Sequence, residues 1–361
     1  MRTYVVDSAA LCGNLENLKN RAGDAVFWAV LKGNGYGLGL LSMARACLSC
    51  GIDHFAVTEV SDAAALRELD AAAQILVLQP TSDPQELSAI ISSDAIATVS
   101  SLQDAEALAE AAGKLGKKPS VHVKIDTGMG RYGFRPSELN DILTLYANES
   151  FLITGIYTHL HSAFCNEASS RAQAAAFRSV VDAIRQAGFD PGMAHLCNSC
   201  GLLRWPEYRM DGVRIGSAIL GRLSIPGNFG LSRIGVCEAA VQELHFIPKG
   251  GTTGYGAGWK AKRDTQIAVF PVGYFHGFGD AMGDDLFRLR DNLRRILSAL
   301  KAILRGKAFY VTVNGRRCRV VGHIGMLHTA VDMTGLDCKV GDIAKFDINP
   351  LLLKGTEVIF R

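Results

Sequence analysis

The chain has 361 residues, of which 48% are hydrophobic and 20% are charged, as is usual for a globular protein. This length exceeds one typical domain, so we expect two domains or one large barrel with an addition. The net charge of +3 at pH 7, without long runs of one sign, excludes a strongly basic chain and argues against nucleic-acid or membrane partners. With no apolar stretch of about 20 residues and no signal-peptide core, we expect a cytoplasmic protein.

Strands and helices alternate through the first two thirds of the chain. Residues 1–6 can form a strand, and Asp7 or Ser8 can cap the helix that follows. Eight further strand candidates lie at 26–31, 54–60, 74–79, 95–99, 121–125, 151–160, 193–196 and 212–215. Helical patterns between them, such as 61–69, 103–115 and 170–188, predict an α/β fold: a parallel (β/α)8 TIM-like barrel of about 220 residues.

Polar and charged residues gather where these predicted strands end. In a (β/α)8 barrel the active site forms at the C-terminal ends of the strands. Six residues of chemical interest lie at or just after such ends, namely Lys32, Lys124, Asp126, His159, Asn198 and Arg214. This coincidence predicts an active site at that end of the barrel.

Lys32 ends a buried apolar strand and begins a glycine-rich loop with glycines at 33, 35, 37 and 39. Glycine permits backbone angles that other residues avoid and lets the chain approach a ligand closely. An amine desolvated at such a position has a lowered pKa, which suits Schiff-base chemistry. A lysine at a strand end is more often a solvated boundary residue, so this pattern indicates a function only together with the others.

The chain contains nine cysteines, an odd and scattered set that does not resemble a disulfide framework. Cys47 with Cys50 and Cys197 with Cys200 have a spacing that could form a four-thiolate zinc site. We favour the alternative that Cys47 and Cys50 pack as small apolar residues of a helix, and we expect no metal.

The pattern changes after about residue 230. Strands are predicted at 240–248, 265–274, 309–313 and 316–322, with a hairpin turn at Asn314-Gly315. A helix at 285–304 has a broad apolar face and basic residues opposite, which could indicate a membrane-surface helix, although packing on the domain or on a partner is favoured. We therefore expect residues 1–7 to join a β domain, 8–230 to form the barrel, and 231–361 to form the mainly β domain with the helix inserted.

Seven segments, in order, resemble the alanine racemase family, which uses pyridoxal 5'-phosphate on a fold-type III scaffold. They are residues 29–37 (AVLKGNGYG), 123–134 (VKIDTGMGRYGF), 158–159, 195–199, 213–216, 254–256 and 272–274. The resemblance runs nearly end to end. It implies a cofactor-binding barrel, a C-terminal β domain, and a head-to-tail homodimer with shared active sites.

The resemblance also implies roles in a two-base racemisation. Removing a weakly acidic α-proton needs the cofactor as an electron sink, with bases on both faces. Lys32 would hold the cofactor as a Schiff base and then act on one face, while the partner subunit's Tyr255 would act on the other. A phenol with a pKa near 10 must be tuned for this role, and His159 is the matching neighbour.

Other residues take binding roles by the same resemblance. Arg214 would face the pyridine nitrogen, and His195 would orient Arg214. Arg131 and the partner subunit's Met326 would hold the substrate carboxylate. Lys124 matches a lysine that is carbamylated in many relatives, and the carbamylated side chain would hold Arg131 in place. The implied cofactor-binding set is Lys32, Tyr36, His159, Asn198, Ser199, Arg214, Gly216 and Ser217.

Departures from the family pattern bear on the substrate. Phe275-His276 replaces the usual Ala-Asp, and Leu327 stands where aspartate is typical. No tyrosine follows Tyr310, and Asn349 lies near the position of a tyrosine that limits the pocket, which resembles the serine-accepting branch. The prediction is therefore an alanine racemase that could also accept serine.

The sequence leaves two other functions open. A fold-type III decarboxylase is disfavoured because Arg214 stands where a carboxylate is expected. A non-catalytic cofactor-binding homologue is kept open by His276 and Leu327, although the β domain and Tyr255 argue against it.

Overall fold

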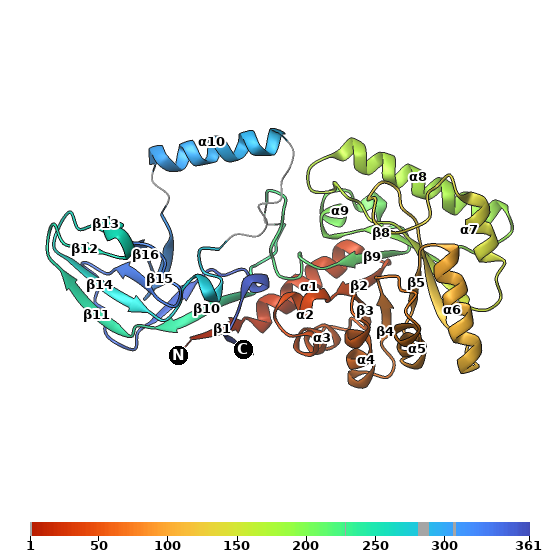
Figure 1. The fold of residues 1–361 in the computed structure, drawn as a ribbon, viewed down its shortest axis with the longest axis horizontal. Coiled ribbons are helices and arrows are strands. Elements are labelled where there is room, and N and C mark those ends of the chain that lie inside the picture. Colours follow the sequence, from red (N-terminus) through yellow and green to blue (C-terminus); the bar gives the residue numbers. More distant parts are fainter. Residues whose placement is uncertain (1, 228, 281–288, 306–307) are drawn as a thin grey trace. The chain divides into compact units, whose positions relative to one another are not determined.

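The computed structural model describes residues 2–227, 229–280, 289–305 and 308–361. It divides into two compact units, one formed by Ser8–Ile234 and the other by Met1–Asp7 with Gly235–Arg361 (Figure 1). The second unit thus begins four residues later than residue 231, where the sequence pattern changes.

The first unit contains the predicted parallel barrel. Its sheet has the order β4-β3-β2-β9-β8-β7-β6-β5, and a parallel bridge between Leu76 and Ile96 joins β4 to β5, so the ring nearly closes. The strands are β2 (Val26–Val30), β3 (His54–Val57), β4 (Gln74–Val77), β5 (Ala97–Val99), β6 (Ser120–Lys124), β7 (Leu152–Tyr157), β8 (Met193–Cys197) and β9 (Gly212–Ile215). All eight predicted strands are confirmed, with ends that differ by three residues or fewer.

Helices cover the outside of this ring (Figure 1). They are α1 (Ser8–Ala22), α3 (Leu40–Ser49), α4 (Val60–Leu69), α5 (Pro84–Ser92), α6 (Leu102–Leu115), α7 (Leu139–Tyr146), α8 (Glu167–Gln186) and α9 (Ser199–Arg204). The short segment α2 (Lys32–Tyr36) is a left-handed turn directly after β2. Helix α8 illustrates why they form: Ala174, Phe177, Val181 and Ile184 are buried at helical spacing. The Asn166 side chain accepts a hydrogen bond from the Ser169 N–H and caps its start.

An apolar layer fills part of the barrel interior. Trp28, Val30, Ala56, Leu76 and Ile96 form one buried cluster. The Trp28 indole N–H lies 3.3 Å from the Met193 sulfur, and its ring stacks on His195 at 6.1 Å between centroids. The barrel is therefore a packed core rather than a pore.

The second unit is built on a nine-stranded sheet of order β11-β14-β17-β16-β15-β18-β10-β1-β19. Its strands are β1 (Arg2–Val6), β10 (Gly235–Ala240), β11 (Glu243–Ile247), β14 (Thr265–Phe270), β15 (Tyr310–Val313), β16 (Arg316–Val321), β17 (Thr329–Asp332), β18 (Ile343–Phe346) and β19 (Glu357–Phe360), and β12 (Thr252–Thr253) pairs separately with β13 (Trp259–Lys260). The N-terminal strand β1 lies between β10 and β19.

Local chemistry explains where this unit follows the sequence pattern and where it departs. Asn314 and Gly315 have φ of 47° and 75°, as the tight turn of the β15–β16 hairpin requires. The predicted strand 240–248 corresponds to β11, and β10, which ends at Ala240, was not predicted. The predicted strand 265–274 stops at Phe270, because the next residue, Pro271, has no N–H to donate.

Helix α10 (Leu289–Arg305) corresponds to the predicted inserted helix, of which residues 285–288 lie outside the described residues. The sequence predicts that its apolar side chains pack on the domain or on a partner, yet in this single chain its described leucine and isoleucine side chains are half or more exposed. Within the described part of the chain, no helix is long and apolar enough to cross a membrane.

Candidate active site

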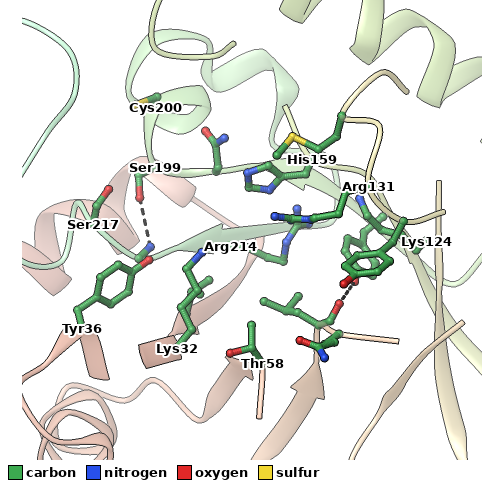
Figure 2. Close-up of a pocket in the computed structure, with 18 residues that line it drawn as sticks. Lys32, Tyr36, Thr58, Lys124, Arg131, His159, Ser199, Cys200, Arg214 and Ser217 are labelled. Atoms are coloured by element: carbon green, nitrogen blue, oxygen red, sulfur yellow. Dashed lines mark hydrogen bonds between the residues drawn. The ribbon is translucent and has the colours of Figure 1, made fainter. Parts of the chain in front are cut away.

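A cavity of about 450 Å³ opens where the barrel strands end (Figure 2). Strands β2, β6, β7 and β9 each deliver side chains to it. It contains ten of the residues singled out from the sequence: Lys32, Tyr36, Lys124, Arg131, His159, Asn198, Ser199, Arg214, Gly216 and Ser217. Tyr255 and Met326 belong to the second unit.

The cavity carries a strongly positive lining. Lys32, Lys124, Arg131 and Arg214 all line it, and none of the described residues around it is an aspartate or glutamate. Fixed charges of one sign in a low-dielectric cleft attract a ligand of the opposite sign. The site is therefore built for an anionic ligand.

Lys32 is presented by an unusual turn directly after β2. Gly33, Asn34, Gly35 and Tyr36 have φ of 62°, 54°, 62° and 57°, so this segment turns in the left-handed sense. The glycines make the turn accessible without steric cost, and the Asn34 side-chain oxygen accepts a hydrogen bond from the Leu40 N–H at 2.9 Å. Lys32 keeps some solvent access, yet desolvation and the nearby Arg131 charge lower its pKa.

An anion cradle lies beside Lys32. The backbone of Gly216 approaches the Tyr36 hydroxyl so closely that a Cβ at 216 would overlap that hydroxyl. The Ser199 hydroxyl oxygen accepts an N–H hydrogen bond from Gly216 at 3.2 Å (Figure 2). It accepts another from Ala218 at 3.3 Å, which leaves its own proton to donate. Burial raises the pKa of Tyr36 to about 12, so its phenol stays protonated and can also donate.

Arg214 is fixed by three hydrogen bonds. One guanidinium nitrogen donates to His195 Nδ1 at 2.8 Å and to the His195 carbonyl at 3.0 Å, and the other donates to the Thr158 carbonyl at 2.6 Å. Burial lowers the pKa of Arg214 only to about 10, so it remains a cation. Its orientation is therefore set by backbone and imidazole acceptors rather than by a carboxylate.

The same contacts assign the protons on two buried histidines. Because arginine can only donate, His195 Nδ1 is an acceptor and its Nε2 holds the proton. His195 Nε2 then donates to His122 Nδ1 across 3.0 Å. Burial and the Arg214 charge lower the pKa of His122 to about 3 and that of His195 well below its usual range. Both imidazoles are neutral.

This burial of neutral histidine predicts how stability depends on pH. Between about pH 6.5 and pH 3 the unfolded chain binds a proton at His122 that the folded chain does not, so stability falls as the pH falls through this window. Replacing His122 with Asn keeps an acceptor for His195 and removes the titration. Urea unfolding at several pH values and fixed protein concentration gives the free energy of unfolding as a function of pH. In this window we expect the slope of that curve to be shallower for the variant than for the unsubstituted protein by about 1.4 kcal/mol per pH unit.

The control for this prediction is His245→Asn, at an exposed position of β11. If His122→Asn leaves the slope of stability against pH unchanged, His122 is not held neutral in the folded protein.

Tyr157 was missed by the sequence analysis and lies at the centre of the cations. Lys124 Nζ and Arg214 Cζ each lie 4.7 Å from its ring centroid, a range in which cation–π attraction operates. Its hydroxyl bonds to the Thr98 hydroxyl at 2.9 Å and donates to the Leu78 carbonyl at 3.2 Å. Residues two apart in a strand point to the same face. Tyr157 is two residues before His159, and His122 is two before Lys124, so this alternation could have indicated both residues from the sequence.

Lys124 is almost fully buried, with 6% of its surface exposed. Burial and the Arg214 charge bring the pKa of Lys124 well below its usual range. Its ammonium form is therefore disfavoured, and a neutral amine is available for modification.

The loop after β6 carries Arg131 to the mouth of the cavity. The Asp126 carboxylate accepts hydrogen bonds from the Gly128 and Gly130 N–H groups, and a bridge between Ile125 and Phe134 closes the loop. Although partial burial acts in the opposite direction, these donors hold the pKa of Asp126 below its ordinary value. Asp126 thus shapes the loop.

Several singled-out residues have local structural partners. The Asn198 amide donates to the Leu160 carbonyl at 3.0 Å and accepts from the Gly201 N–H at 2.9 Å, so it caps α9. His276 is buried and its Nδ1 accepts the Gly273 N–H at 3.0 Å. Asn349 caps a short helical turn by accepting the Leu351 N–H. Tyr255 is 83% exposed between two glycines.

The zinc alternative finds no support in the part of the chain that the structure describes. No group of three or more His, Cys, Asp or Glu side chains there could hold a metal ion. All nine cysteines are free, with Cys47 and Cys197 buried. The Cys50 thiol instead contacts the Cys12 sulfur at 3.0 Å.

Comparisons with known proteins cover both units. A model of the alanine racemase N-terminal domain matches residues 6–224, and one of the alanine racemase C-terminal domain matches residues 236–348. The alanine racemase of Methylacidiphilum infernorum is 31% identical over 350 residues, which are 95% of this chain and 82% of that protein. Alanine racemase 1 of Oceanobacillus iheyensis is 29% identical over 94% of this chain and 85% of its own.

A solved structure agrees with these matches. The alanine racemase of Clostridium difficile 630 superposes with a TM-score of 0.83 at 25% identity, covering 100% of this chain and 95% of that one.

Proposed function

The chain belongs to the alanine racemase family, whose two domain models together match most of its length, and from this premise we propose that it interconverts L- and D-alanine with pyridoxal 5'-phosphate as cofactor. It is an amino-acid racemase, as its relatives are. The observation that carries the proposal is the cavity at the barrel mouth, where four basic side chains and no described carboxylate surround an anion cradle next to Lys32.

The residues present fit this cofactor. Its phosphate matches the hydroxyl donors of Tyr36 and Ser199, which lie beside the Gly216 backbone at one end of the cavity. Its aldehyde requires an amine with a lowered pKa, which Lys32 provides. When bound, the cofactor supplies the electron sink that makes an α-proton removable.

The chain's own residues orient this chemistry and move the protons. We assign Lys32 to hold the cofactor and to serve as the base on one face. Arg214, held by the His195 and Thr158 acceptors, lines the cavity as a permanent cation, so it would contact the cofactor without giving up a proton to it. His159 also lines the cavity; burial and the Arg214 charge bring its pKa well below the usual range, so it is a neutral neighbour.

The second base is the partner subunit's Tyr255 in this proposal, and the enzyme is a homodimer with shared sites. Tyr255 supports this assignment by its exposure at the tip of a glycine-flanked turn in the single chain. The partner subunit's Met326 would offer its backbone to the substrate carboxylate opposite Arg131. We place the enzyme in the cytoplasm.

Lys124 has the neutral amine that reaction with carbon dioxide requires. We propose that it is carbamylated: the neutral amine adds carbon dioxide and loses a proton, which places an anion near Arg131 and Arg214. The change would relieve like-charge repulsion at this end of the cavity.

Serine is the second candidate substrate. Asn349, which the resemblance places near the pocket-limiting tyrosine, caps a helical turn with its side-chain oxygen. Family membership leaves the decarboxylase and the non-catalytic hypotheses without support from these comparisons.

The test uses the cofactor-loaded enzyme in deuterated water. L-alanine and L-serine are offered separately, and chirality and α-deuterium are measured together. Deuterium that enters with inversion, faster from alanine than from serine, is the expected result. Release of carbon dioxide, or cofactor binding without any α-exchange, would refute the proposal.

A further inference from the structure

Helix α10 presents an apolar face to solvent. Its described apolar side chains at the exposed face, with their exposed fractions, are Leu289 (75%), Leu293 (52%), Ile296 (57%), Leu297 (58%) and Leu300 (50%). At 3.6 residues per turn these positions fall within an arc of about 100°. A continuous apolar stripe of this kind on a surface marks an interaction site.

Positive charge is concentrated on the same helix. Residues 289–305 contain five basic residues, at 290, 294, 295, 301 and 305, and one acidic residue, Asp291. Five minus one gives +4, whereas the whole chain carries +3, so the other residues sum to −1. The modest net charge of the chain therefore conceals a strongly basic segment of 17 residues.

The sequence pattern places the basic residues away from the apolar stripe. Arg294 and Lys301 follow one edge of the stripe at helical spacing, and Arg295 falls on the other side. An apolar face bordered by arginine and lysine is typical of helices that lie in the plane of a membrane interface. Helix α10 is not a membrane-spanning helix, and a surface-bound helix need not be one.

We propose that α10 docks the enzyme on an anionic lipid bilayer. Leu289, Leu293, Ile296, Leu297 and Leu300 would enter the boundary between head groups and acyl chains, and the basic residues would contact lipid phosphates. The helix spans about 25 Å, long enough to lie across several head groups. The inference is independent of the reaction catalysed in the barrel.

Charge complementarity favours lipid over a second copy of the same face. Pairing α10 with the α10 of another chain would bring two segments of +4 together, and like charges repel. A membrane surface rich in anionic lipid offers both the negative charge and the apolar layer beneath it.

The test is co-sedimentation of the full-length, cofactor-loaded enzyme with vesicles. One set contains phosphatidylcholine alone, and the other contains phosphatidylcholine and phosphatidylglycerol in equal amounts. We expect binding to the anionic vesicles only, weakened at high salt because surface charges are screened. Absence of sedimentation with anionic vesicles at low salt would overturn the proposal.

Two variants assign the binding to α10. Leu293→Ser with Ile296→Ser should lower the ratio of bound to free enzyme about tenfold or more, and Arg294→Glu with Lys301→Glu should do the same. The matched control is Leu152→Ser in the barrel, because Leu152 is also a leucine with 53% exposure, and it should leave binding unchanged. Undiminished binding by both double variants would refute the assignment to α10.

Light scattering without vesicles tests whether a second copy of the chain covers the apolar face of α10. We expect Leu293→Ser with Ile296→Ser to leave the molar mass and the racemase rate unchanged. A fall in molar mass would show that a second copy covers this face, and the lipid proposal would then be wrong.

Discussion

Replacing Lys32 with alanine is expected to lower the racemisation rate by about a thousandfold or more. In the proposed function the Lys32 amine both holds the cofactor and moves the proton on one face, and Lys124 is not a substitute because it is buried on a different strand, β6. The rate is measured by chiral separation of product. Reduction with borohydride followed by peptide mass analysis should place the cofactor on Lys32 in the unsubstituted enzyme and on no peptide of the variant.

The loss should not come from unfolding. Desolvation and the Arg131 charge lower the pKa of Lys32, which means that its charged form is disfavoured where it lies. Removing it relieves repulsion from Arg131, so we expect the variant to melt at the same or a higher temperature. Functional residues often lower the stability of the folded protein, so replacing one commonly raises the melting temperature.

Two controls accompany this prediction. Lys32→Arg keeps the positive charge but replaces the amine with a guanidinium, which stays protonated. This variant should be as inactive as Lys32→Ala. Lys114→Ala, at an exposed position of α6, should retain full activity. If Lys32→Ala retained a tenth of the original rate, the base on that face would have to be another residue.

The barrel and the centre of the site could be predicted from the sequence because both follow from burial. Parallel strands covered by helices are apolar along their length, so all eight appeared as apolar runs separated by amphipathic segments. The residues that end those runs, such as Lys32, Lys124 and Arg214, necessarily lie at one rim. That topology brings them into one cavity.

The parts that were missed depend on contacts remote in sequence. His122 and Tyr157 lie within predicted strands, and only the fold shows that they support His195, Lys124 and Arg214. Strand β18 has four residues with alternating burial, too short a pattern to distinguish from a loop. The apolar stripe of α10 fits a packed helix equally well, and only its exposure in the structure separates the two.

A mixed dimer is expected to recover activity from two inactive chains. Lys32→Ala removes the base on one face, and Tyr255→Phe removes the hydroxyl on the other while keeping the ring. If each site combines Lys32 of one subunit with the partner subunit's Tyr255, a heterodimer of the two variants contains one intact site. It should racemise alanine at about half the rate of the unsubstituted dimer.

The experiment uses two different affinity tags on co-expressed chains, so that only heterodimers survive both purification steps. A tagged pair of two Lys32→Ala chains is the control and should stay inactive. Were Lys32 and Tyr255 to act within one chain, every site of the heterodimer would lack one base and no activity would return. Recovery therefore requires shared sites, and it would explain why Tyr255 stands exposed on the single chain while Lys32 lines a cavity of the barrel.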